Sequence, residues 1–263
     1  MNNLRESSLI PRSYVPAETS QNIRRSGLKP IVNLLSDVPP LEYSSKLKTP
    51  LGVVPGNIIP NFAVLEGGDG SGTTTQLSLL TERLKNTEKP VFFPTFEPTD
   101  GQIGALIRSA LRKELPLNPE TLAMLFACDR NEHLYGDDGI IVRVNRGELV
   151  VSDRYVCSSL VYQGIECGDE LPMALNSRFG IPQVTIFLDV EPEIALARVN
   201  KRKTLDIYEY REFQEKVRDR YRAVLDNYSS MGARVETIDA SKSIEEVSDQ
   251  VWSIISSLPI FKL

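Results

Sequence analysis

The amino-acid sequence predicts an α/β fold, with one five-stranded parallel sheet and helices on both of its faces. Short apolar runs alternate along the chain with segments whose apolar residues recur at helical spacing. The first of these runs leads through a glycine-rich turn directly into a helical pattern. Helical crossovers between successive strands are the connections of a parallel sheet, and they cover both of its faces.

The first half of the predicted fold is a strand, a helix, a second strand and two further helices. The run NFAVLEG (61–67) is short, apolar and ends in glycine, so it predicts a buried strand. TTTQLSLLTERLK (73–85) follows with apolar residues at helical spacing. VFFPTF (91–96) predicts a second strand, in which Pro94 indicates an irregularity. Helical patterns then cover 104–114 and 118–135.

Three more strands complete the predicted sheet. They are ELVVSD (148–153), QVTIFLDV (183–190) and ARVETIDA (233–240). Helical patterns over 191–202 and 208–228 separate the last two. A final helix begins at a capping box, in which Ser243 is followed three residues later by Glu246.

The first 56 residues differ in composition from the rest of the chain. They are rich in Pro, Ser and Asn and show no sustained apolar period, so we expect a flexible extension over 1–56 and one folded domain over 57–263. An organellar transit peptide is an alternative, because arginines lie there among serines, although Glu6 and Glu18 weaken it. A start codon assigned too early is another.

Composition and charge exclude several classes of function. The net charge is −5 and the N-terminal segment is net positive, so the negative body argues against nonspecific nucleic-acid binding. No apolar run approaches the ~20 residues that span a membrane. The three cysteines lack metal-ligand spacing and cannot all pair, so we expect a reducing compartment and a cytoplasmic protein. The single histidine, His133, is expected at the surface or at a helix end.

The glycine-rich turn between the first strand and the first helix predicts a phosphate site. Backbone N–H groups of such a turn and the positive end of the helix converge on an anion. Gly67 and Gly72 have the spacing of the pattern G-x-x-x-x-G-K-[ST], and Thr74 stands where its Ser/Thr ligates magnesium. Thr73 stands where the pattern has lysine. A glycine-rich turn without a ligand remains the alternative.

The absent lysine requires a replacement if the loop serves catalysis. Removing one preorganised donor from a transferring phosphoryl group typically costs ~10²- to 10³-fold in rate. The nearest basic cluster in the predicted fold follows the fourth strand and comprises Arg198, Lys201, Arg202 and Lys203. The alternative for this cluster is an ordinary solvated helix end.

The third strand ends in two charged residues. Ligands of open α/β sheets bind beyond the carboxyl ends of the strands, so Asp153 and Arg154 should face the phosphate loop. Asp153 can hold magnesium or its water shell, and Arg154 can donate two bonds to a phosphate. A buried structural ion pair is the alternative.

Four blocks, taken together, give the chain a family resemblance. GGDGSGTTTQ, FEPTDGQIGALIR, LFACDR and DRYVCSSLVYQG occur in this order, and the sequence resembles the thymidylate kinase family. PQVTIFLDVEPEIALAR gives weaker support. The resemblance runs from near Phe62 to near Leu258 and leaves the N-terminal extension out. It implies a P-loop nucleoside monophosphate kinase-like fold with a lid, Mg²⁺ with ATP as the phosphoryl donor, and a homodimer.

The resemblance also implies a role for each acceptor-side residue. Phe126 would stack on the thymine ring and Arg130 would donate to a base carbonyl oxygen. Tyr162 would lie under the sugar. The full dTMP-binding set is Phe96, Arg108, Phe126, Arg130, Arg154, Ser159, Tyr162 and Gln163. Taken without the resemblance, Phe126 is a core aromatic residue and Arg130 forms a salt bridge at the surface.

The implied catalytic and donor-side residues lie at the phosphate loop, near it and in the lid. The catalytic set is Asp69, Arg108, Asp153 and Arg154, in which Asp69 reaches the 3′-hydroxyl or orients an arginine. Thr74 and Asp153 would hold the metal. The ATP-binding set is Gly67, Gly68, Gly70, Ser71, Gly72, Thr73, Thr74, Thr75, Arg198 and Arg202, with 198–203 as part of the lid.

Three positions depart from the family pattern, and they keep other functions open. Thr73 replaces the loop lysine, and Phe96 stands where an arginine is frequent. Ile207 stands where family members without a basic residue in the loop usually carry a lid arginine. The resemblance implies transfer of the γ-phosphoryl group of MgATP to dTMP, giving dTDP and ADP. A nucleotide-binding protein with weak or no kinase activity is one alternative. A deoxynucleoside kinase, with Glu97 as general base, is another.

Overall fold

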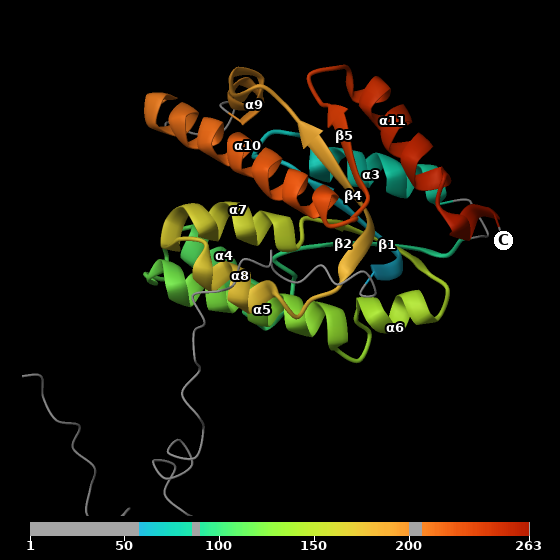
Figure 1. Cartoon of the computed structure of the whole chain (residues 1–263), viewed down its shortest axis with the longest axis horizontal. Helices are drawn as coiled ribbons and strands as arrows, with labels where there is room; N and C mark the ends of the chain where they lie inside the picture. Colours follow the sequence, from blue (N-terminus) through green and yellow to red (C-terminus); the bar gives the residue numbers. More distant parts are fainter. Residues whose placement is uncertain (1–57, 86–89, 200–206, 263) are drawn as a thin grey trace, which may run out of the picture. The chain divides into compact units, whose positions relative to one another are not determined.

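The computed structural model describes residues 58–85, 90–199 and 207–262 (Figure 1). Its centre is a five-stranded, all-parallel sheet in the order β2-β3-β1-β4-β5. The predicted parallel sheet is thereby confirmed. The strands are β1 (Ile58–Glu66), β2 (Phe92–Phe96), β3 (Leu149–Asp153), β4 (Ile181–Asp189) and β5 (Val235–Asp239).

Helices connect all of the strands. They are α3 (Thr73–Leu84), α4 (Gln102–Leu111), α5 (Pro119–Tyr135), α6 (Ile140–Asn145), α7 (Val156–Cys167), α8 (Glu170–Asn176), α9 (Pro192–Val199), α10 (Ile207–Ser230), α11 (Ile244–Ser256) and the 3₁₀ helix η1 (Pro259–Lys262). The spacing of apolar residues assigns no helix to α6, α7 and α8. The predicted capping box is confirmed, because Ser243 and Glu246 exchange side-chain to backbone hydrogen bonds of 3.2 and 3.0 Å.

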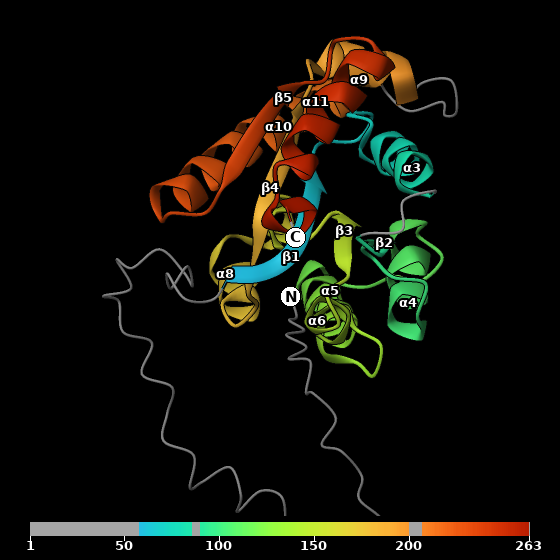
Figure 2. The ribbon, with the colours of Figure 1, turned by 90° about the vertical axis from the view of Figure 1, so that its right-hand side faces the viewer.

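Helices cover both faces of the sheet, as the sequence predicts. Along β1, Phe62 and Val64 pack into a cluster with residues of α5, α6, α7 and α10. The intervening Ala63 and Leu65 pack into a second cluster with residues of α3, α9 and α11. Alternation of side chains along a strand produces this division. Figure 2 shows α10 and α3 on opposite sides of the strands.

The irregularity predicted at Pro94 is not in the strand pairing. β2 pairs with β3 in unbroken register, and Pro94 lies opposite Val151. β2 is an edge strand, where a missing N–H group is tolerated. The register shift lies instead between β1 and β4, around Asn61, whose φ is 57° and whose N–H donates to Gln183 Oε1 at 2.9 Å.

The carboxyl ends of the strands lie at one edge of the sheet and position the site. β1 leads into the phosphate loop, β2 into Glu97 and β3 into Arg154. Residues 200–206, which contain most of the predicted lid, lie outside the described residues. Within the described part of the chain, no helix is both long and apolar enough to cross a membrane.

Candidate active site

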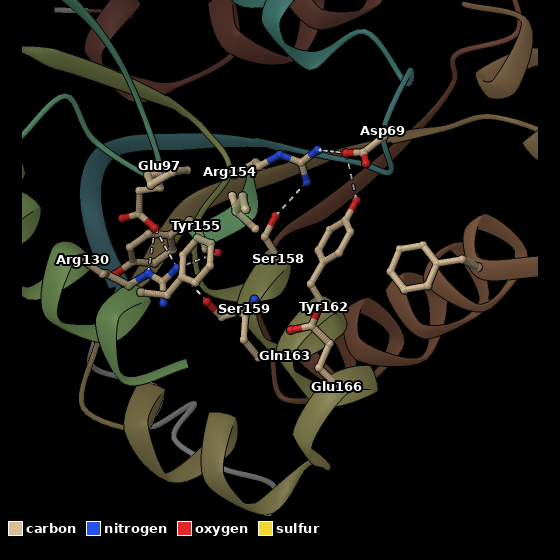
Figure 3. Close-up of a pocket in the computed structure, with 14 residues that line it drawn as sticks. Asp69, Glu97, Arg130, Arg154, Tyr155, Ser158, Ser159, Tyr162, Gln163 and Glu166 are labelled. Carbon is tan, nitrogen blue, oxygen red and sulfur yellow. Dashed lines mark hydrogen bonds and ion pairs between the residues drawn. The ribbon is translucent and has the colours of Figure 1, made fainter. Parts of the chain in front are cut away.

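A cavity of about 320 Å³ opens beside the phosphate loop, at the carboxyl edge of the sheet (Figure 3). Its walls come from the loop itself, from the segment after β2, and from α4, α5, α7 and α10. The lining residues are Asp69, Glu97, Pro98, Leu111, Phe126, Arg130, Arg154, Tyr155, Ser158, Ser159, Tyr162, Gln163, Glu166 and Phe213. The cavity therefore combines aromatic side chains with two arginines.

The phosphate loop has the backbone conformation of an anion-binding turn. Gly70 and Gly72 have φ values of 82° and 97°, a region that favours glycine. Gly72 is the N-cap of α3 and accepts the N–H of Gln76 at 2.9 Å. The N-terminus of α3, with its free N–H groups and positive dipole end, thus lies at the loop.

Thr74 and Asp153 bring two oxygen groups together beside the loop. Thr74 Oγ1 donates to Asp153 Oδ2 at 2.6 Å. Asp153 Oδ1 is buried and has no hydrogen-bond partner among the described residues. Hydroxyl and carboxylate oxygens are ligands that Mg²⁺ accepts, directly or through its waters. The pair therefore fits a magnesium ion.

Arg154 joins the phosphate loop to the pocket. Its Nη2 pairs with Asp69 Oδ1 at 3.0 Å, and its Nη1 donates to the Gly67 carbonyl oxygen at 3.0 Å. The φ of Arg154 is 75°, a conformation that side-chain-bearing residues adopt only when the surroundings impose it. Tyr162 lies with its ring 5.3 Å from the guanidinium and its hydroxyl 3.3 Å from Asp69. The guanidinium is thus held in the pocket wall, beside Asp69 and Tyr162 (Figure 3).

Arg130 forms the other end of the pocket wall, and only 1% of its side chain is exposed. Its Nε donates to Glu97 Oε2 at 2.9 Å, and its Nη2 donates to the Ser159 hydroxyl at 3.1 Å. Its Nη1 donates to Asn176 Oδ1. Glu97 in turn lies 3.1 Å from His133 Nδ1. This network fixes the guanidinium in one orientation.

Comparison with known proteins assigns the fold to a family. The family model described as thymidylate kinase matches residues 65–251. The chain belongs to the thymidylate kinase family. A "Probable thymidylate kinase" of Pyrobaculum aerophilum is 40% identical over 204 residues, which are 76% of this chain and 99% of that protein.

Other members of the thymidylate kinase family align over the same region. A "Probable thymidylate kinase" of Methanocaldococcus jannaschii is 36% identical over 200 residues, covering 75% of this chain and 97% of its own length. A "Thymidylate kinase" of Ligilactobacillus salivarius is 34% identical over 208 residues, covering 74% and 97%.

The cavity brings together most of the residues that the sequence assigns to the acceptor. Those that line it are Phe126, Arg130, Arg154, Ser159, Tyr162 and Gln163, and Asp69 of the predicted catalytic set lines it too. Two others lie outside its lining. Arg108 folds back on the segment after β2, where it donates to the carbonyl oxygens of Pro98 and Thr99. Phe96 is 42% exposed and lines a separate hollow at the end of β2.

Two expectations about polar residues are corrected. Arg130 is buried, so the alternative of a surface salt bridge is wrong. His133 lies near the end of α5, as expected, but only 9% of its side chain is exposed. The cause is its position between two polar side chains, because Nε2 lies 2.6 Å from Thr95 Oγ1 and Nδ1 lies 3.1 Å from Glu97 Oε1.

On the donor side, one cation of the predicted cluster reaches the phosphate loop. Arg198, in α9, donates to the carbonyl oxygens of Gly70 at 3.3 Å and Ala240 at 2.9 Å. Lys201, Arg202 and Lys203 lie outside the described residues. Ile207 is the first residue of α10.

Among the residues that contact the site, Ser158, Tyr221 and Asn176 have no role predicted from the sequence. Ser158 and Tyr221 contact Arg154 Nη1 at 3.2 and 3.3 Å, and Asn176 holds Arg130. Ser158 precedes Ser159 in the block DRYVCSSLVYQG, and this position next to a predicted site residue could have indicated its role. Tyr221 and Asn176 belong to distant helices and carry no local signal.

Replacing Gly70 by alanine should distort the phosphate loop. A Cβ at Gly70 would lie 2.5 Å from the Ala195 carbonyl oxygen, and its φ of 82° is unfavourable for alanine. We expect the Kd for ATP to rise at least about tenfold because the loop must shift. Gly147→Ala is the matched control, since it has the same φ but open space around its Cβ. Isothermal titration of ATP compares the two, and equal Kd values would contradict this account.

Proposed function

We propose that this protein transfers the γ-phosphoryl group of ATP to dTMP, producing dTDP and ADP. One observation carries the proposal. Arg154 lies between the phosphate loop and the cavity, where it can bind the phosphate of an acceptor nucleotide. Membership in the thymidylate kinase family supports the same reaction.

The polar groups of the cavity suit a thymine base. Arg130 lines the cavity and would turn an N–H group toward the base, and the buried Oε1 of Gln163 has no hydrogen-bond partner among the described residues. Thymine presents a carbonyl acceptor at position 4 and an N–H donor at position 3, whereas cytosine presents the opposite pair. Leaving buried polar groups unpaired is costly, so this arrangement supports dTMP over dCMP. Phe126 would supply the stacking surface.

Magnesium would be held by Thr74 and Asp153, and when bound it neutralises charge on the ATP phosphates. Thr73 occupies the usual lysine position of the loop. Arg198 contacts the loop at Gly70, and we propose that it and Arg202 supply the cationic groups of the donor side. Arg154 and Asp69 orient the acceptor, so the reaction depends on positioning and on neutralised charge.

The acceptor phosphate already carries an anionic oxygen, so the transfer needs no strong general base. A deoxynucleoside kinase would need one, and Glu97 is the residue that the sequence suggests. Both of its oxygens are engaged, one by Arg130 and the other by His133. A phosphorylated acceptor is therefore the better-supported substrate.

We also propose that the protein is a homodimer and that residues 1–56 form an extension outside the kinase domain. Beside the acceptor pocket, α4 and α5 expose apolar side chains, with Leu106, Leu111 and Met124 each about half exposed. Burial of such side chains against a second copy would stabilise a dimer.

An acceptor comparison tests the proposed function. The full chain with MgATP is assayed for ADP release with dTMP, thymidine, dUMP and dCMP. We expect dTMP to be turned over fastest and dCMP and thymidine at rates close to the blank. Faster turnover of thymidine than of dTMP would favour a deoxynucleoside kinase. Binding of dTMP without ADP release would favour a nucleotide-binding protein without kinase activity.

Thr73→Lys tests whether the donor side lacks a cation. If Arg198 and Arg202 only partly replace the loop lysine, the variant should raise kcat about tenfold, less than the ~10²- to 10³-fold of a whole preorganised donor. Ser78→Lys is the control, because it adds the same charge to an exposed position of α3 away from the loop. Equal kcat values for wild type and Thr73→Lys would show that the replacement is complete.

A further inference from the structure

Glu66 is a fully buried carboxyl group to which the sequence assigns no role. It is the last residue of β1 and directly precedes Gly67 of the phosphate loop. None of its surface is exposed. Charged side chains are almost never fully buried without a partner, so its surroundings should reveal what it does.

Both carboxyl oxygens of Glu66 contact the start of α7. Oε1 accepts the backbone N–H groups of Tyr155 at 3.0 Å and Ser158 at 3.3 Å. Oε2 accepts the Ser158 hydroxyl at 2.7 Å and the Tyr221 hydroxyl at 3.1 Å. Free N–H groups of a first helical turn need such a cap. The cap of α7 thus comes from β1, about 90 residues earlier in the chain.

The same hydroxyl groups connect Glu66 to the acceptor side. Ser158 Oγ and Tyr221 OH lie 3.2 and 3.3 Å from Arg154 Nη1. One hydroxyl group therefore separates the carboxyl of Glu66 from the guanidinium that we assign to the acceptor phosphate. Tyr162, one helical turn further along α7, lines the same pocket.

Among the titratable groups around it, Glu66 is the one that changes charge near neutral pH. Burial raises its pKa to about 7, against the opposing effects of the Ser158 hydrogen bond and the charge of Arg154. The other titratable groups that face it are Arg154 and Cys157 around the start of α7 and Tyr221 and Tyr228 on α10. Burial raises the pKa of each of these tyrosines and of the Cys157 thiol well above its usual value, so they remain neutral.

We propose that Glu66 is a positioning residue that takes up a proton when dTMP binds. This inference rests on the proposed function, because it requires the acceptor phosphate to bind Arg154. A bound phosphate repels the Glu66 carboxylate and also offsets the attraction that Arg154 exerts on it. Both effects favour the protonated carboxyl. Its new O–H group then donates to the hydroxyl oxygen of Ser158 or Tyr221, each of which can accept.

The proposed role of Glu66 is tested by measuring how many protons the protein takes up when dTMP binds. Binding of dTMP to the full chain is measured by isothermal titration calorimetry at pH 7.5 in two buffers of different ionisation enthalpy. Glu66→Gln keeps the size of the side chain and, like the protonated carboxyl, can donate to the Ser158 or Tyr221 hydroxyl oxygen, but it cannot titrate. The phosphate of dTMP also titrates in both proteins, so the proton count of Glu66→Gln is subtracted, and the difference reports the proton uptake that depends on Glu66.

If dTMP raises the pKa of Glu66 by about one unit, the wild type should take up about half a proton more than Glu66→Gln. The dTMP affinity of the wild type should also fall up to about tenfold relative to the variant as pH rises from 6 to 9. A carboxylate that only caps α7 would lower the stability of the variant but leave the proton counts equal, and equal counts overturn the proposal.

Failure of this proposal and failure of the proposed function give different results. If dTMP produces no binding heat with the wild type and no ADP release, both the proposed function and the proton uptake by Glu66 are contradicted. If dTMP binds and the proton counts of the wild type and Glu66→Gln are equal, only the proton uptake by Glu66 is contradicted. Should Glu66→Gln not fold, the wild-type carboxyl ¹³C resonance that titrates near pH 7 is followed with and without dTMP. An upward shift of its midpoint supports the proposal, and an unchanged midpoint overturns it.

Discussion

Replacing Arg154 by alanine is expected to lower kcat/KM for dTMP by about 10²–10³-fold. The guanidinium is held by Asp69 and the Gly67 carbonyl oxygen at the point where an acceptor phosphate would meet the phosphate loop. Loss of a preorganised, partly buried donor removes charge stabilisation that water cannot replace. Steady-state kinetics with varied dTMP measures the effect.

Two further variants make the Arg154 result specific. Arg154→Lys keeps the charge but loses the forked geometry of the guanidinium, so we expect its kcat/KM for dTMP to lie between those of Arg154→Ala and the wild type. Arg143→Ala removes another partly buried, ion-paired arginine, which bonds Asp138 and Glu148 away from the pocket. It should change stability but leave kcat/KM near the wild-type value. A kcat/KM for Arg154→Ala within a few fold of the wild-type value would contradict the assigned role.

Replacing Arg130 by methionine is expected to lower the free energy of unfolding by about 3–5 kcal/mol. Glu97 is only 3% exposed and lies 2.7 Å from Arg130 Nη2. Removing the arginine leaves this carboxylate buried without its cation, which costs far more than the lost contact alone. Urea unfolding at fixed pH measures the change.

A double-mutant cycle separates the buried charge from the lost packing. Glu97→Gln in the Arg130→Met background removes the unpaired charge, so the double variant should be more stable than the sum of the two single changes predicts. The coupling should exceed about 1 kcal/mol. Additive changes in the free energy of unfolding would contradict an energetic coupling between Arg130 and Glu97. A decrease of less than about 1 kcal/mol for Arg130→Met would also contradict it.

The order of strands and helices could be predicted because each element is encoded locally. Apolar spacing along 61–67 and 73–85 requires no knowledge of distant contacts. Local sequence patterns predict the structure less well where tertiary contacts determine it. Pro94 indicates an irregularity by itself, but the edge position of β2 removes the conflict. The short helix α8 is stabilised by packing against α5 and α7, which its own sequence does not reveal.

The site could be predicted where its residues follow strand ends or form contiguous blocks. Asp153 and Arg154 end β3, and the topology of a parallel sheet brings them to the phosphate loop. Glu66 and Tyr221 could not be found in this way. They meet across 155 positions of the chain, and their roles arise only when α10 packs against α7.

Burial was the property least accessible from the sequence. His133 and Arg130 are polar residues on a helix with little amphipathic character, so nothing local places them inside. Their burial follows from Glu97, which directly follows β2 and contacts both side chains. A polar network of this kind is visible only when the two segments are in contact.

Identification of the product tests the proposed phosphoryl transfer most directly. The full chain is incubated with Mg²⁺, dTMP and ATP labelled at the γ-phosphate, and the nucleotides are separated by anion-exchange chromatography. We predict that the label moves into dTDP, and that Arg154→Ala abolishes most of this transfer. Label that remains in ATP, with dTMP shown to be bound, would contradict phosphoryl transfer and leave a nucleotide-binding protein.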